Sequence, residues 1–221
     1  MSNIDSFISH IQAHAKSILN EISFTTKDID KISKLCTQVV GDTLTSQEKG
    51  VLLERMILEI FIKHKLFDIK SNIRTSTNEI DLLLAPSHIG SAILSTLYNS
   101  FFTDNIILEC KNYKDNIGVT YIGKLGNLVS VSNSKIGIMI TRKGITGVNN
   151  WNDGKGLIRK ISLKHDVQIL DFKLDDFLEI KGITIFELLQ NKLDALLTDT
   201  NIEHWTKHDL ESQYQGILEN A

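Results

Sequence analysis

The most informative stretch of the chain is Ile106-Ile107-Leu108-Glu109-Cys110-Lys111, an apolar run that ends in an acid and a lysine. An apolar run of this length predicts a buried β-strand. Because side chains alternate along a strand, Glu109 and Lys111 are expected to share one face. Burying two charges is costly unless they are paired or hold a metal ion. The stretch therefore predicts a central strand with a polar site at its end.

A second carboxylate is expected beside this site. Asp81 lies 28 residues before Glu109, in a predicted strand over about 79–84. Its neighbour Glu79 is expected to face solvent. Asp81 on an adjacent strand would complete a site for a cation.

A fourth candidate, Glu54, lies in a predicted helix over about 46–64. The preceding Thr45-Ser46-Gln47-Glu48 has the form of a capping box. Packing of this helix on the sheet would aim Glu54 at the same cation. Glu48 and Glu59 are weaker alternatives for that role.

Strands and helices alternate through the rest of the chain, which predicts an α/β sandwich around a mixed sheet. Further strands are expected near 67–74, 135–141 and 167–171, and further helices near 4–21, 27–40, 89–102, 119–132, 148–164, 175–180 and 183–197. The predicted organisation is an N-terminal helical extension (1–44), an α/β domain (45–197) and an acidic tail (198–221). The apolar helix 89–102 is an insertion for which core packing, a dimer surface and a lid all stay open.

The charge is unevenly distributed along the 221 residues, although the net charge of the chain is only −3. Residues 111–164 carry 10 Lys/Arg and 2 Asp/Glu, a net charge of +8, and this segment begins at the candidate site. A positive field beside carboxylates suits a phosphodiester substrate, and a solvated basic face is the alternative. Lys114, Lys124, Thr141, Arg142 and Lys143 are the candidate nucleic-acid contacts.

The composition of the chain indicates the cellular compartment in which the protein is expected. No apolar run is long enough to span a bilayer, and Met1-Ser2-Asn3-Ile4-Asp5 lacks the features of a signal peptide. The 2 cysteines, Cys36 and Cys110, make neither a disulfide framework nor a zinc site. We expect a cytoplasmic protein without a membrane partner.

The residue types at the site favour hydrolysis assisted by a hard cation. Mg²⁺ prefers oxygen ligands, which Asp81, Glu109, the Cys110 backbone carbonyl and Glu54 can offer. The Lys111 ammonium can stabilise charge that develops at phosphorus. If its pKa were lowered, Lys111 could also take a proton from the attacking water.

In their order along the chain, these residues resemble the PD-(D/E)xK nuclease superfamily and, within it, the Mrr-type restriction endonucleases. The matching elements, over about 45–190, are Gly50-x-x-x-Glu54, Glu79-Ile80-Asp81-Leu82, Glu109-Cys110-Lys111, the helix 119–132 and Thr141-Arg142-Lys143-Gly144. Ile80 stands in place of the proline that names the superfamily, and 86–105 is an apolar insertion.

The resemblance implies a restriction-endonuclease-like three-layer sandwich and a Mg²⁺-dependent endonuclease acting on DNA, with Mn²⁺ able to substitute. It also implies a role in restriction or anti-phage defence, with a homodimer and possible regulation by a partner subunit. Open alternatives are a nuclease for RNA, branched or single-stranded nucleic acid, and a catalytically idle nuclease fold that serves as a binding or assembly subunit.

Overall fold

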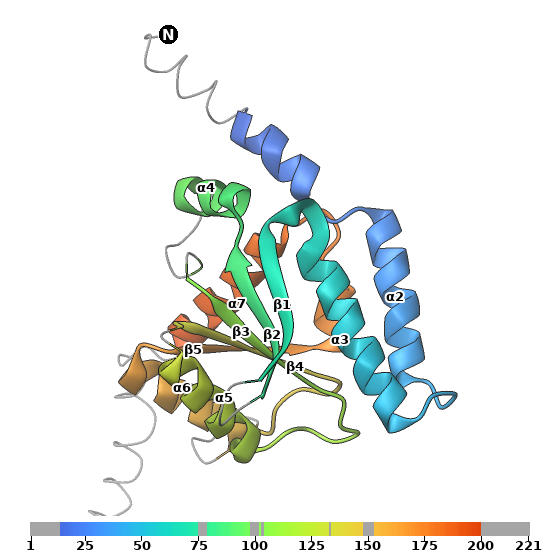
Figure 1. The fold of residues 1–221 in the computed structure, drawn as a ribbon, viewed down its shortest axis with the longest axis vertical. Coiled ribbons are helices and arrows are strands. Elements are labelled where there is room, and N and C mark those ends of the chain that lie inside the picture. Colours follow the sequence, from blue (N-terminus) through green and yellow to red (C-terminus); the bar gives the residue numbers. More distant parts are fainter. Residues whose placement is uncertain are drawn as a thin grey trace, which may run out of the picture.

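A five-stranded mixed sheet forms the centre of the fold in the computed structural model, which describes residues 14–74, 79–97, 102, 104–132, 134–147 and 153–199 (Figure 1). The strands, in both chain and sheet order, are β1 (Phe67–Arg74), β2 (Glu79–Pro86), β3 (Ile106–Lys111), β4 (Ile136–Thr141) and β5 (Gln168–Lys173). The pairs β1–β2 and β2–β3 are antiparallel, whereas β3–β4 and β4–β5 are parallel. The predicted α/β fold with a mixed sheet is therefore confirmed.

Helices cover both faces of this sheet (Figure 1). The described helices with named bounds are α2 (Thr26–Val40), α3 (Ser46–Ile62), α4 (His88–Leu97), α5 (Val119–Val131), α6 (Gly154–His165) and α7 (Ile185–Asp199), with short 3₁₀ turns at Lys63–Lys65 and Leu174–Phe177. Helix α3 packs against β1 and β3, and α2 packs on α3. Helices α5 and α6 pack on the opposite face, against β4 and β5.

The alternation of side chains along β3 divides the core into two apolar layers. Ile106 and Leu108 join α2, α3 and α7 in one layer, and Ile107 joins α5 and α6 in the other. All three side chains have no measurable exposure. Strands buried on both faces need continuous apolar runs, which is why β3 and β4 lack an alternating polar pattern.

Several element bounds differ from the sequence prediction. The segment expected as a helix over 175–180 is a 3₁₀ turn at Leu174–Phe177, and the last strand extends to Lys173. Helix α6 begins at Gly154 with Asp153 as its N-cap, and the predicted start at 148 lies outside the described residues. The same holds for most of the first predicted helix, of which 14–22 is described as helical, and for the tail after 199.

The helices predicted over 27–40 and 46–64 correspond to α2 and α3. The capping box of α3 is confirmed, since the Thr45 side chain accepts from the Glu48 N–H and Glu48 accepts in return. Helix α2 contributes Ile32, Cys36 and Val39 to the same core layer as α3. Residues 26–40 are therefore packed into the body of the domain.

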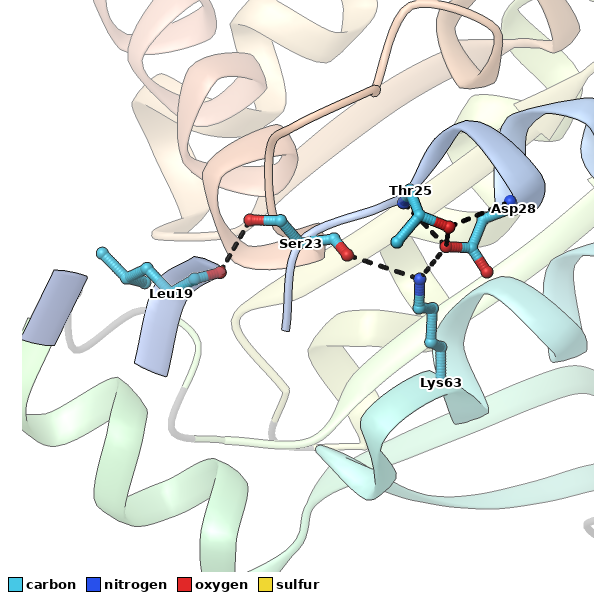
Figure 2. A network of polar contacts seen from close by, with 5 residues as sticks. All are labelled: Leu19, Ser23, Thr25, Asp28 and Lys63. Carbon is cyan, nitrogen blue, oxygen red and sulfur yellow. Dashed lines mark hydrogen bonds and ion pairs between the residues drawn. The ribbon is translucent and has the colours of Figure 1, made fainter. Parts of the chain in front are cut away.

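The segment before α2 is held by a polar network around Lys63 (Figure 2). Lys63 Nζ forms an ion pair with Asp28 and donates to the Ser23 carbonyl at 3.4 Å. Thr25 Oγ1 donates to Asp28 Oδ2 at 2.5 Å within a second capping box. Burial opposes ionisation of Asp28, but Lys63 and Thr25 outweigh it and lower the pKa of Asp28 from 3.8 to about 2.

This network predicts a pH-dependent contribution of Asp28 to stability. Because the folded pKa is lowered, the contribution is present above pH 4 to 5 and is lost as the pH falls toward about 2. Asp28→Asn should lower the free energy of unfolding by about 1–2 kcal/mol at neutral pH, after allowance for solvent screening. Urea unfolding measures this difference.

The matched control is Asp30→Asn, an exposed position on the same helix. It should leave stability unchanged within about 0.5 kcal/mol. Equal stability of Asp28→Asn and wild type at neutral pH would contradict the assigned network.

Candidate functional site

Asp81 lies where the backbone pairing of β2 with β3 ends. The last backbone pair of the two strands joins Leu82 to Leu108. Asp81, which precedes Leu82 in β2, contacts β3 through its side chain instead of its backbone. Asp81 Oδ2 accepts a hydrogen bond from the Cys110 N–H at 2.8 Å. This bond fixes the Asp81 carboxylate against the last residues of β3, as the sequence predicted for neighbouring strands.

Lys111 connects the two carboxylates. Its Nζ forms an ion pair with Glu109 Oε1 and lies 3.7 Å from Asp81 Oδ2. All three side chains are only 17–21% exposed. Glu109 and Lys111 thus share one face of β3, and the two carboxylates converge on a single positive charge.

The electrostatics of the cluster favour a protonated lysine. Burial alone would lower the pKa of Lys111, but its hydrogen bond to Glu109 and the charges of Glu109 and Asp81 outweigh burial and raise the pKa. The lowered pKa that would let Lys111 accept a proton from water is not found in this arrangement. Lys111 is therefore a positive charge in the site.

The pKa of Cys110 reflects the negative potential at the end of β3. Its thiol pKa is raised well above the usual value by burial and then by the charges of Asp81, Glu54 and Glu109. Glu54, on α3, is thus within electrostatic reach of the site, and α3 packs directly against β3. The two carboxylates that contact Lys111, Asp81 and Glu109, outnumber its single ammonium.

The loop after β3 adds polar and aromatic groups. Within the described residues, the buried Oδ1 of Asn112 has no hydrogen-bond partner. The Tyr121 hydroxyl donates to the Tyr113 hydroxyl at 2.9 Å, and the ring centroids are 5.3 Å apart. The bond to Tyr121 is the main cause that raises the pKa of Tyr113, with smaller influences from Lys111 and Glu109. The tyrosine pair is therefore within electrostatic reach of Lys111 and Glu109.

The five candidate nucleic-acid contacts have different surroundings. Lys114, Lys124 and Lys143 are exposed. Thr141 is only 1% exposed, and its hydroxyl accepts the Gly144 N–H at 2.7 Å, so it shapes the turn after β4. Arg142 donates to the Val40 carbonyl at 3.0 Å and so ties this turn to the end of α2.

Asn116 holds the loops after β3 and β4 together. Its Nδ2 donates to the carbonyls of Lys143 at 3.2 Å and Ile145 at 3.4 Å. Ile117 and Ile145 form a parallel bridge between the same loops. Gly144 has a φ of +97°, which disfavours any residue with a side chain at this point of the turn. The loops after β3 and β4 are therefore held together beside the carboxylates.

Two further findings concern the described part of the chain. No group of three or more His, Cys, Asp or Glu side chains there could hold a metal ion. No described helix is both long and apolar enough to cross a membrane.

Comparison with known proteins gives no relative: no family model, curated protein or solved structure matches the chain. The site therefore has to be interpreted from its own geometry.

Sequence reasoning missed two features of this region. The sequence predicts only a helical position for Tyr121, and its contact with Tyr113 depends on how the loop folds back on α5. Lys173 lies beyond the strand predicted over 167–171, and its exposure beside the basic segment is evident only from the fold. A signal for Tyr121 was present, since it is a polar aromatic residue at the start of an apolar helix.

The environment of the two cysteines predicts slow thiol chemistry. Cys110 is 8% exposed and Cys36 6% exposed. Burial, with a smaller effect of Asp175, raises the pKa of Cys36 to about 11. Because the thiolate is the reactive form, both should react with a disulfide reagent at least about 100-fold more slowly in the native than in the denatured protein. Rapid native labelling of Cys110 would contradict the buried environment.

Proposed function

We propose that the protein is a Mg²⁺-dependent endonuclease that hydrolyses DNA, with a restriction-endonuclease-like fold of the PD-(D/E)xK type. The observation that carries the proposal is the convergence of Asp81 and Glu109, from adjacent strands, on the single ammonium of Lys111. Two carboxylates that can meet one cation at the end of a sheet are suited to hold a divalent ion.

The donor set fits a hard cation. Asp81 and Glu109 offer carboxylate oxygens, and the Cys110 carbonyl and Glu54 are the proposed additional ligands. Two carboxylates at one ammonium leave negative charge that a divalent ion would balance. Mg²⁺ needs few protein ligands when substrate phosphate and water complete its shell, which agrees with the small donor set. Mn²⁺ is expected to substitute.

Each side chain has a separate role in the proposed mechanism. When bound, Mg²⁺ would polarise the scissile phosphate and favour ionisation of the attacking water. The protonated Lys111 stabilises negative charge that develops on the phosphoryl oxygens. The Cys110 N–H holds Asp81 in place, so this carboxylate does not have to reorganise when substrate enters.

The charge distribution supports the proposed substrate class. The net charge of +8 over 111–164 supports a polyanionic ligand, and the exposed Lys114, Lys124 and Lys143 are the proposed backbone contacts. We propose that the protein acts as a homodimer, because cleavage of both DNA strands needs two active sites. We also propose that it acts in restriction or anti-phage defence. RNA, branched or single-stranded nucleic acid are the substrates to compare.

Plasmid cleavage with Mg²⁺ tests the proposal. Asp81→Asn, Glu109→Gln and Lys111→Met keep side-chain size and should each reduce the cleavage rate by at least about 100-fold, because each removes a ligand or a charge at the phosphate. Glu54→Gln should have a smaller effect, with Glu59→Gln on the same helix as its control. EDTA should abolish cleavage of every variant.

Circular dichroism would establish that each variant is folded. Cleavage at wild-type rates by all three site variants would contradict the proposed nuclease function. If folded wild-type protein binds DNA, RNA or branched substrates without cutting any of them, the binding-only alternative replaces it.

A further inference from the structure

A second polar region lies beside the candidate site, along the edge strand β5. It is a groove of about 530 Å³ between the turn after β4, helix α6, β5 and helix α7. Apolar side chains such as Ile158, Ile169 and Leu196 contribute to its lining. The sequence alone does not predict this groove.

Cations predominate in the groove. Its charged lining residues are Lys143, Lys155, Arg159, Lys173 and Lys192 against Asp171 and Asp176. Lys192 Nζ lies 2.8 Å from Asp176 Oδ2, so the charges of these two side chains neutralise each other. Lys143, Lys155 and Lys173 are exposed, so a ligand can reach them, and Lys173 Nζ also lies 3.9 Å from the exposed Asp175 Oδ2. Asp171 is the remaining acid, and the excess charge is positive.

The strand register places this groove relative to the carboxylates. Lys111 on β3 is opposite Thr141 on β4, which in turn is opposite Lys173 on β5. At a strand spacing of about 4.8 Å, the backbones of Lys111 and Lys173 are roughly 10 Å apart. Ile107 and Ile169 belong to the same core layer, so by alternation Lys111 and Lys173 face the same side of the sheet.

We propose that this groove binds the sugar-phosphate backbone of the substrate strand, roughly three nucleotides from the bond that is cut. The inference rests on the proposed nuclease function and adds the direction in which the strand leaves the site, past the turn at Lys143 toward Lys155 and Lys173. Phosphates fit the cationic rim, and the apolar floor lowers the local dielectric and so strengthens these contacts.

The test measures binding of a short fluorescein-labelled DNA duplex by anisotropy in EDTA, where hydrolysis does not interfere. Lys155→Gln combined with Lys173→Gln should weaken binding at least about 10-fold and reduce the salt slope by about 2, since each lost phosphate contact removes about 0.9. The matched control, Lys27→Gln with Lys34→Gln, removes two exposed lysines from α2 on the other face and should change affinity less than about 2-fold.

Unchanged affinity and slope in the groove variant would overturn the inference. A free nucleotide is the other source of phosphate, and ATP is its probe. If ATP binds wild type more tightly than the duplex and the groove variant loses only ATP binding, the strand assignment is also overturned. The binding result is independent of the cleavage assay, so loss of this inference and loss of the nuclease assignment can be told apart.

Discussion

The hydrogen bond from the Cys110 N–H to Asp81 is the contact on which the candidate site depends. It replaces a backbone pair at the point where β2 and β3 stop pairing, and it brings Asp81 beside Glu109 and Lys111. A carboxylate held in this way stays partly buried among other charges, which a fold tolerates only with strong compensation. Lys111 supplies part of that compensation, and the remaining negative potential is the physical reason to propose a divalent cation.

Sequence reasoning could predict this part of the fold because the signals were local. An apolar run ending in Glu109-Cys110-Lys111 specifies a buried strand, and strand alternation places Glu109 and Lys111 together. The capping box at Thr45 likewise marks the start of α3 from four adjacent residues. Neither inference needed knowledge of distant contacts.

Other properties depend on residues far apart in the chain. The raised pKa of Lys111 reflects Asp81 and Glu109 at distances that spacing does not give. Thr141 looked available to a ligand, yet its hydroxyl is used by Gly144 in a buried turn. The cationic groove needs Lys143, Lys155 and Lys173 from a turn, a helix and a strand. Counting charges along the chain locates the positive segment but does not show on which face of the sheet its side chains lie.

Calorimetric titration of Mg²⁺ into wild type, Glu109→Gln and Lys111→Met tests the central claim most directly, because it detects the cation site without requiring catalysis. The account predicts that Glu109→Gln loses measurable binding, since one of two converging carboxylates is gone. Lys111→Met should bind Mg²⁺ about 10-fold more tightly than wild type, because the competing ammonium has been removed. Equal Mg²⁺ binding by all three proteins, or none by any of them, would contradict the account.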